Sequence, residues 1–199
     1  MSSSVSRPKR QSAAVASAQT LGRMRTIEAS RCTLEPQVVA HAPEMFGVLS
    51  DPAIYEFENQ PPPSESWLAE RYARLECRAS SDGSQLWLNW VVRLPSGQLA
   101  GYVQATVLRS SVALVAYELA SRHWRQGIGR CAVAAMLAEL QASYGVTLFA
   151  AVLKKANFRS LAFLRGLGFE QGSGEQAVQL GVKPDELLMV RAVPTENAA

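Results

Sequence analysis

Residues 117–130, which read YELASRHWRQGIGR, constrain the fold of this chain more than any other segment. An apolar run typical of a β-strand ends in a turn and passes through Gly127 and Gly129 into a long amphipathic stretch typical of a helix. Glycines at the start of a helix let backbone N–H groups approach an anion, and the helix N-terminus adds roughly half a positive charge. The segment predicts either a phosphate-binding turn or an ordinary strand-to-helix turn, because paired glycines serve both purposes.

The composition favours one globular domain without metal or disulfides. The chain has 199 residues, 48% of them apolar, which is enough for one domain with a substantial core. No apolar run approaches the roughly 18 residues that span a bilayer, so no membrane association is expected. Cys32, Cys77 and Cys131 are an odd, scattered set without CxxC spacing, which favours a cytoplasmic protein without a disulfide framework or a zinc site. With only two histidines, a histidine-rich metal centre is not expected either.

Basic residues are concentrated near the N-terminus. Residues 1–31 hold six basic groups and one acidic group, a net charge of +5, whereas the other 14 basic and 16 acidic groups leave −2. The folded part has no basic stripe suited to nucleic acid, so no nucleic-acid partner is expected. Residues 1–26 are rich in serine, alanine and glutamine and lack hydrophobic periodicity, which predicts a disordered tail. A targeting segment and a start at Met24 are the alternatives.

The remaining pattern predicts one α/β domain over residues 27–193, followed by a short tail over 194–199. Three β-rich runs joined by short turns, residues 86–94, 99–108 and 111–120, predict an antiparallel meander. A helix over 127–144 then leads to a buried strand over 148–152, which a right-handed crossover makes parallel to the third run. Further helices are expected over 43–49, from Ser64 to about residue 78 and from Asn157 to Gly168, and further strands over 33–39 and 182–193. The expected architecture is a mixed, mostly antiparallel sheet flanked by helices on both faces, with a central β-α-β unit.

A second segment, residues 157–169 (NFRSLAFLRGLGF), completes a recognisable pattern. Together with residues 117–130 it resembles the GCN5-related N-acetyltransferase (GNAT) family. Residues 42–55, which include an SDP turn, and the LAGYV run at 99–103 resemble the branch of ribosomal-protein N-terminal acetyltransferases (RimJ/RimL-like) and their antibiotic-modifying relatives. The resemblance covers roughly residues 31–193 and implies a single-domain GNAT fold whose β-α-β unit binds acyl-CoA.

The resemblance also implies a site for acetyl-CoA. In the family the third strand of the meander splays from the next parallel strand, and the pantetheine arm pairs with the exposed backbone. Carried over residue by residue, the cofactor-binding set is Leu119, Ala120, Ser121, Arg125, Gln126, Gly127, Ile128, Gly129, Arg130, Asn157 and Phe163. Residues 126–130 would offer N–H donors to the pyrophosphate, Arg125 or Arg130 would add a charge-assisted contact, and Asn157 would hold the pantetheine arm, cap its helix, or both.

Two departures from the family pattern lie in the same loop. Trp124 stands where the family commonly has arginine or glutamine. Arg125 stands where glycine is usual, and it restricts the backbone of the turn.

The implied reaction is transfer of an acetyl group from acetyl-CoA to a primary amine. An alkyl ammonium with a pKa near 10 must first lose a proton, so a carboxylate acting directly or through water is expected. Glu118 is the candidate base, with a solvated strand residue as the alternative. Ser160 is the candidate acid for the leaving thiolate, because Phe163 stands where many members have tyrosine; the alternative for Ser160 is a local backbone hydrogen bond. The N–H of Leu119 is a candidate oxyanion donor.

The acceptor is expected to be a protein N-terminus or a small amine. Candidate lining residues are Tyr55, Glu56, Glu58 and Trp67, although a surface-loop role is an alternative for each. The competing interpretation is a catalytically degenerate domain that senses acyl-CoA or acts as a scaffold. A monomer and a homodimer are both compatible with the sequence.

Overall fold

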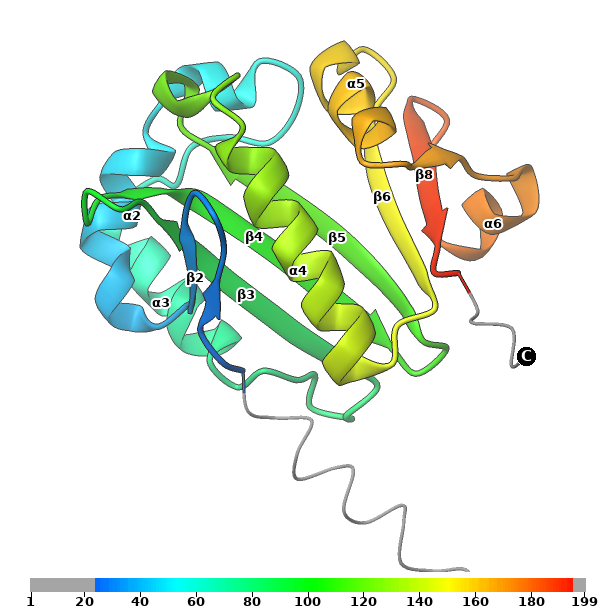
Figure 1. The fold of residues 1–199 in the computed structure, drawn as a ribbon, viewed down its shortest axis with the longest axis horizontal. Helices are drawn as coiled ribbons and strands as arrows, with labels where there is room; N and C mark the ends of the chain where they lie inside the picture. The colour runs from blue at the N-terminus through cyan, green and yellow to red at the C-terminus, as the bar shows by residue number, and fades with distance from the viewer. Residues whose placement is uncertain (1–23, 195–199) are drawn as a thin grey trace, which may run out of the picture.

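The computed structural model describes residues 24–194, so most of the predicted N-terminal tail and residues 195–199 lie outside the described residues. Figure 1 shows one twisted sheet crossed by a long helix. Its eight strands follow the order β1-β2-β3-β4-β5-β6-β8-β7. The strands are β1 Ile27–Glu28, β2 Thr33–Pro36, β3 Gln85–Arg93, β4 Leu99–Leu108, β5 Val112–Leu119, β6 Leu148–Lys154, β7 Glu170–Gln171 and β8 Glu186–Ala192. All neighbours pair antiparallel except β5 and β6, so the predicted mixed sheet with a β-α-β unit is confirmed.

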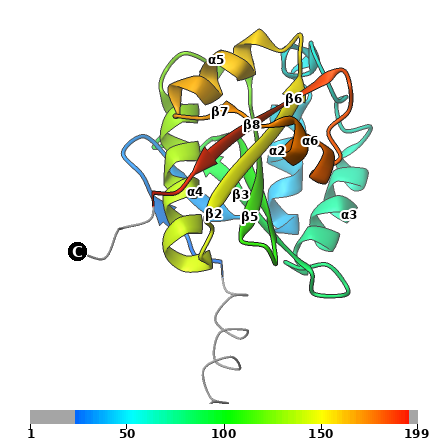
Figure 2. The same cartoon turned by 90° about the vertical axis from the view of Figure 1, so that its right-hand side faces the viewer.

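Helices cover both faces of the sheet. They are α2 Ala42–Leu49, α3 Glu65–Leu75, α4 Ile128–Tyr144, α5 Phe158–Gly166 and α6 Gly174–Gln179, with short 3-10 turns at Val39–His41, Pro52–Tyr55 and Ser121–His123. The side view in Figure 2 places α4 and α5 on one face and α2, α3 and α6 on the other. Alternation along β3 serves both layers: Trp90 belongs to the core under α4, whereas Val91 belongs to the core under α2 and α3.

The parallel pair β5 and β6 is joined at one end only. Hydrogen-bonded register covers Val112–Leu114 against Leu148–Ala150 and stops there, although both strands continue. Figure 1 shows the two strands diverging towards the start of α4. The second half of β5 thus has a free edge towards β6, as the resemblance implied.

A close approach of backbones fixes β4 against the diverging part of β5. Gly101 has φ 157°, and a Cβ added there would lie 2.0 Å from the carbonyl oxygen of Glu118. The β3–β4 register also shifts between Val92 and Arg93, which is a β-bulge beside the same point. Glycine is therefore required where the sheet turns towards the loop that precedes α4.

Several predicted boundaries move in the structure. The helix from Ser64 ends at Leu75 rather than near residue 78, because Arg78 takes a left-handed backbone with φ 60°. The last strand begins at Glu186 rather than at 182, because α6 and its closing turn occupy the preceding residues. The short elements β1, β7 and α6 were not predicted, and none of the six residues of α6 is buried.

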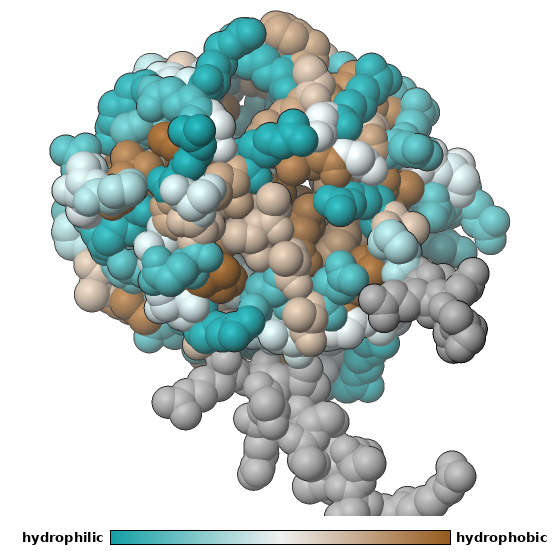
Figure 3. All heavy atoms as spheres, viewed as in Figure 1, coloured by the Kyte–Doolittle hydropathy of each residue, from teal (hydrophilic) through white to brown (hydrophobic). Residues whose placement is uncertain are grey.

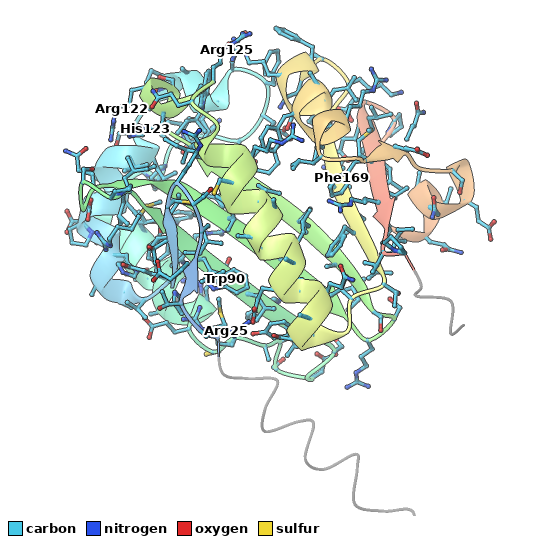
Figure 4. The ribbon with its side chains drawn as sticks, viewed as in Figure 1. Arg25, Trp90, Arg122, His123, Arg125 and Phe169 are labelled. Carbon is cyan, nitrogen blue, oxygen red and sulfur yellow. The ribbon has the colours of Figure 1, made fainter. Side chains whose placement is uncertain are left out.

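The described residues at the N-terminus lie against the domain. Met24 packs on the main core, and the backbone carbonyl of Arg25 accepts a hydrogen bond from the Trp90 indole (3.1 Å), an arrangement labelled in Figure 4. The Arg25 guanidinium pairs with Glu139 of α4, whose side chain is only 4% exposed. Residues 24–26 of the predicted tail therefore make specific contacts.

The visible surface carries no single dominant patch. On the face that carries α4, hydrophilic and hydrophobic residues interleave (Figure 3). Within residues 24–194 no helix is both long enough and apolar enough to cross a membrane.

Candidate active site

The loop before α4 forms the turn predicted from the two glycines. Gly127 is the N-cap of α4 with φ 78°, and Arg125 is also left-handed with φ 58°. Left-handed residues at alternate positions turn successive N–H groups towards one side, which makes an anion-binding concavity at a helix N-terminus. Figure 4 shows Arg125 projecting outward from this loop, which also carries Arg122 and His123. Gln126 closes the loop by donating to the Arg122 carbonyl (2.7 Å).

The two glycines leave room for different neighbours. A Cβ on Gly127 would lie 3.5 Å from Nε of Arg31, so a cation that was not predicted for the site stands beside the turn. A Cβ on Gly129 would lie 3.5 Å from the Phe163 ring, so this glycine sits where α5 approaches α4. Ile128 between them is a core residue, 8% exposed, and Arg130 reaches Gly166 of α5. The fit of the loop to an anion thus depends on backbone N–H groups and nearby arginines.

Leu119, Ala120 and Ser121, which are predicted to pair with the pantetheine arm, differ in whether their backbone N–H groups are already hydrogen-bonded. The Ala120 N–H donates to the Ala100 carbonyl (2.9 Å), and the Ser121 N–H donates to Oδ2 of Asp51 (2.6 Å). The Leu119 carbonyl accepts from the Trp124 indole (2.8 Å), which gives the departure at Trp124 a structural role. Because N–H directions alternate along an antiparallel strand, Leu119 directs its N–H to the side where β6 has diverged. Leu119 alone of the three keeps a donor for that opening.

A cavity of about 430 Å³ opens beside the diverging strands. Its walls come from β5, from the opposite strand β6, from the start of α5, and from α3 with the segment before it. Of the predicted residues it brings together Glu118, Ser160 and Asn157, as well as Tyr55, Glu58 and Trp67.

Glu118 points into this cavity from β5 and is half-buried. Burial raises the pKa of the Glu118 carboxyl above its usual value, and favourable interactions with Tyr102 and Asn59 offset this only in part. Asn59 donates to Oε1 of Glu118 at 3.4 Å, and Tyr102 is the cross-strand neighbour of Glu118 on β4. A carboxylate with a raised pKa beside an opening is suited to accept a proton near neutral pH.

Ser160 meets a residue that the sequence did not single out. Its Oγ lies 2.7 Å from Oη of Tyr117, and its N–H donates to Oδ1 of Asn157. The Tyr117 ring packs against Phe163 with centroids 4.5 Å apart. Burial raises the pKa of the Tyr117 phenol, so this hydroxyl stays protonated and can keep Ser160 supplied with a proton. A tyrosine hydroxyl thus lies near the site after all, on β5 instead of at position 163.

Asn157 caps α5 and also binds across the cavity mouth. Its Oδ1 accepts from the Ser160 N–H, and its Nδ2 donates to Oε1 of Glu58 (3.0 Å). The segment around Glu58 is further joined to α5 by the Glu56–Arg159 ion pair (2.5 Å) and by an edge contact of Phe57 on Phe158. We call residues 56–59 the bridging segment. The Glu56 carboxylate is thus already paired with Arg159 at the surface, while Glu58 lines the cavity.

The remaining predicted lining residues are Tyr55 and Trp67. The Tyr55 hydroxyl donates to the Leu49 carbonyl (2.9 Å), so it is already satisfied. Trp67 is 40% exposed at the edge of the cavity, with the Arg71 guanidinium over its ring. The periodicity of α3 could not identify Arg71 as a site residue, because Arg71 lines the cavity together with strands that are distant from α3 in the sequence.

Metal ligands are not gathered in the part of the chain that the structure describes. No group of three or more His, Cys, Asp and Glu side chains there could hold a metal ion, and Cys32, Cys77 and Cys131 are free thiols.

Comparison with known families decides the identity of the fold. Residues 31–170 match the family model described as an acetyltransferase (GNAT) domain. The chain belongs to the GNAT family. The resemblance stated from the sequence is therefore confirmed, and acetyl-CoA is the cosubstrate that this GNAT fold uses.

Solved structures share the GNAT fold at low identity. RimL, a ribosomal-protein alpha-N-acetyltransferase in complex with coenzyme A, aligns with a TM-score of 0.71 at 15% identity, over 85% of this chain and 98% of that one. RimJ of Mycobacterium smegmatis, in complex with a CoA disulfide, also aligns at 0.71, with 18% identity over 86% and 89%. The microcin self-immunity acetyltransferase MccE, in complex with acetyl-CoA and AMP, aligns at 0.67 with 17% identity over 82% and 93%. No curated protein sequence gives a significant match.

Proposed function

We propose that this GNAT protein transfers the acetyl group of acetyl-CoA to the nitrogen of a primary amine. The observation that supports it best is Glu118, a half-buried carboxylate with a raised pKa that faces the cavity beside the opening of β5 and β6. RimL, which shares the fold, is an alpha-N-protein acetyltransferase, and this supports an amine acceptor.

The proposed role of each residue in binding acetyl-CoA follows from its position in the site. The turn at 125–130 would hold the pyrophosphate through backbone N–H groups, with Arg125, Arg130 and the neighbouring Arg31 adding positive charge. The Leu119 N–H would hold the thioester carbonyl oxygen at the strand opening. When bound, acetyl-CoA supplies the electrophilic carbonyl carbon and the thiolate leaving group.

Proton transfers complete the proposed reaction. Glu118 accepts the proton of the acceptor ammonium, which frees the nitrogen lone pair to form the C–N bond as the C–S bond breaks. The acylated nitrogen then loses its second proton to solvent water. Ser160 donates its hydroxyl proton to the leaving sulfur and recovers one from Tyr117, 2.7 Å away, which is reprotonated from the same solvent. Because Phe163 has no proton to give, this hydroxyl pair replaces the tyrosine usual at that position.

The alternative is an acyl-CoA sensor that binds without turnover, which Phe163 keeps open. Calorimetric titration of acetyl-CoA and desulfo-CoA, followed by thiol release with a panel of amines, separates the two. The Gly127→Glu variant should bind both on the order of tenfold or more weakly, because its carboxylate repels the pyrophosphate. Gly145→Glu is the matched control, since Gly145 is equally left-handed (φ 63°) at the other end of α4.

Each outcome has a definite meaning. Binding with amine-dependent thiol release supports the transferase, and binding without release for any amine supports the sensor. Equal binding in the two glycine variants would contradict the assignment of the turn. A cytoplasmic location, consistent with three free cysteines, and a monomeric or homodimeric state remain part of the proposal.

A further inference from the structure

Two buried polar groups in the cavity wall have no partner within the described residues. Gln37 and Tyr72 are each 3% exposed, and both line the cavity. Neither Nε2 of Gln37 nor Oη of Tyr72 makes a hydrogen bond in residues 24–194. Leaving such a group unpaired costs about 1–3 kcal/mol, so native proteins seldom keep two side by side without a use.

The same wall carries a free positive charge. Arg71 lines the cavity one residue before Tyr72 on α3, and among the described residues no carboxylate lies within 4 Å of it. Its guanidinium rests over the Trp67 ring at 5.8 Å, which orients it without neutralising it.

The backbone of Gln37 is held in place by two hydrogen bonds. Its N–H donates to the Asn89 carbonyl (2.9 Å), and its carbonyl accepts from Nη2 of Arg78 (2.5 Å). These bonds fix the Gln37 backbone beside the cavity that its side chain lines. Gln37, Arg71 and Tyr72 together form what we call the donor wall.

The same cavity also carries negative charge. Glu118 on β5 and Glu58 of the bridging segment both line the cavity, and the Glu58 charge adds to the effect of burial that raises the pKa of the Glu118 carboxyl. The cavity thus holds both signs of charge, with carboxylates on β5 and the bridging segment and a guanidinium with hydrogen-bond donors on the donor wall. A ligand that matches it has a cationic and an anionic end.

Resting on the proposed function, we propose that the acceptor is a primary amine that also carries a carboxylate. Its ammonium lies at Glu118, and its carboxylate lies on the donor wall, where it accepts from Arg71, Tyr72 and Gln37. A carboxylate takes up to four hydrogen bonds and so satisfies all three donors at once, whereas a diamine would leave them unpaired and be repelled by Arg71. This chemistry is found in the amide of an acidic amino acid and in the acidic N-terminal residue of a peptide.

Matched acceptors test the carboxylate directly. Thiol release from acetyl-CoA is measured for glutamate against glutamine and aspartate against asparagine, as free amino acid amides and as the first residue of otherwise identical short peptides. We expect kcat/KM to favour the acidic member of a pair by at least about tenfold, which is what one charge-assisted contact contributes. In both series only the side-chain carboxylate differs within a pair, and whichever of the amide and peptide series is turned over identifies the source of the acceptor.

Variants of α3 tie the preference to the donor wall. Arg71→Gln should bring the acidic-to-neutral ratio of kcat/KM close to one, whereas Arg74→Gln, an exposed arginine three residues further along α3 and outside the cavity, should leave the ratio as in wild type. Tyr72→Phe should lower the ratio without lowering the melting temperature, because it removes a buried hydroxyl that has no partner in the chain. A purely structural role of that hydroxyl would lower the melting temperature and leave the ratio unchanged.

The outcomes separate this inference from the proposed function. Turnover of amines with a ratio near one in wild type, or an unchanged ratio in Arg71→Gln, overturns the carboxylate acceptor and leaves the transferase standing. Binding of acetyl-CoA without turnover of any acceptor overturns both.

Discussion

Glu118 shows at the scale of one residue how the fold prepares a base. Burial raises the pKa of its carboxyl, while hydrogen bonds from Tyr102 and Asn59 oppose that rise. We expect Glu118→Gln to lower kcat/KM by about 100- to 10,000-fold, the usual range for losing a general base. The pH profile should also lose its acidic limb, which in wild type should lie above the ordinary glutamate range. An unchanged limb in the variant would assign the base to another group.

The same substitution has an opposite effect on stability. A carboxyl whose pKa is raised in the folded state binds protons more tightly there, so folding stability falls as pH rises from the unfolded pKa through the folded one. Glutamine cannot ionise, so Glu118→Gln should be at least as stable as wild type at pH 8 and lose that advantage near pH 4. Urea unfolding at the two pH values measures this difference. A variant less stable than wild type at pH 8 would show that the favourable interactions of the Glu118 carboxylate outweigh the cost of burying it.

Arg125 combines a charge with an unfavourable backbone. Its left-handed φ of 58° costs a non-glycine residue about 1–2 kcal/mol. We expect Arg125→Gly to be more stable than Arg125→Ala by about 1 kcal/mol in urea unfolding, because alanine keeps the strain. Both variants should lose the same part of the acetyl-CoA affinity, since both remove the cation. Different affinities would mean that the shape of the turn also matters for binding.

The sequence could predict some of these residues and not others. Gly127, Gly129 and Glu118 follow from a local pattern, because the turn and the strand before it are contiguous. Tyr117, Asn59, Arg71 and Arg31 could not be found in that way, since each acquires its meaning from a partner far along the chain. Tyr117 is the clearest case: its contact with Ser160 spans 43 positions.

At the scale of elements, the longer strands could be predicted because their alternating residues and short turns are local features of the sequence. The ends of the elements could not, because each depends on the backbone angles of single residues. The helix from Ser64 began where it was predicted, with the Ser64 hydroxyl accepting from the Trp67 N–H, but stopped early at the left-handed turn of Arg78. The helix after Asn157 ends at Gly166 with Leu167 as its C-cap, and the left-handed Gly168 follows in the C′ position that the sequence predicted for it. α6 has a Ser173–Gln176 capping box but no buried face, so no hydrophobic period announced it.

The contact between β4 and β5 gives an element-scale prediction. In Gly101→Ala the new Cβ would meet the Glu118 carbonyl oxygen at 2.0 Å, so the two strands must move apart. We expect a loss of at least about 2 kcal/mol of unfolding free energy, with activity reduced because Glu118 shifts. Gly47→Ala is the control: this helical glycine in α2 has open space around it and should gain about 0.5–1 kcal/mol. Similar changes in the two variants would mean that β4 and β5 adjust without cost.

At the scale of the whole molecule, the segment before β1 connects distant parts of the core. Arg25 reaches the Trp90 indole on β3 through its carbonyl and Glu139 on α4 through its guanidinium. That pairing holds the pKa of the Glu139 carboxyl below its usual range. A chain that starts at Met24 keeps both contacts, whereas a chain that starts at Ile27 with an added methionine leaves the buried Glu139 carboxylate without its cation.

We therefore expect the Ile27 chain to unfold at a lower urea concentration than the Met24 chain at pH 7. A depressed folded pKa contributes stability above the unfolded pKa and loses it as pH falls, so the difference should shrink below about pH 4.5. Arg25→Ala in the Met24 chain should reproduce the loss from the ion pair but keep the bond from Trp90, and so fall between the two. Equal midpoints for all three chains would show that residues 24–26 lie on the domain without stabilising it, and a difference that persists in acid would assign their contribution to Trp90 instead of Glu139.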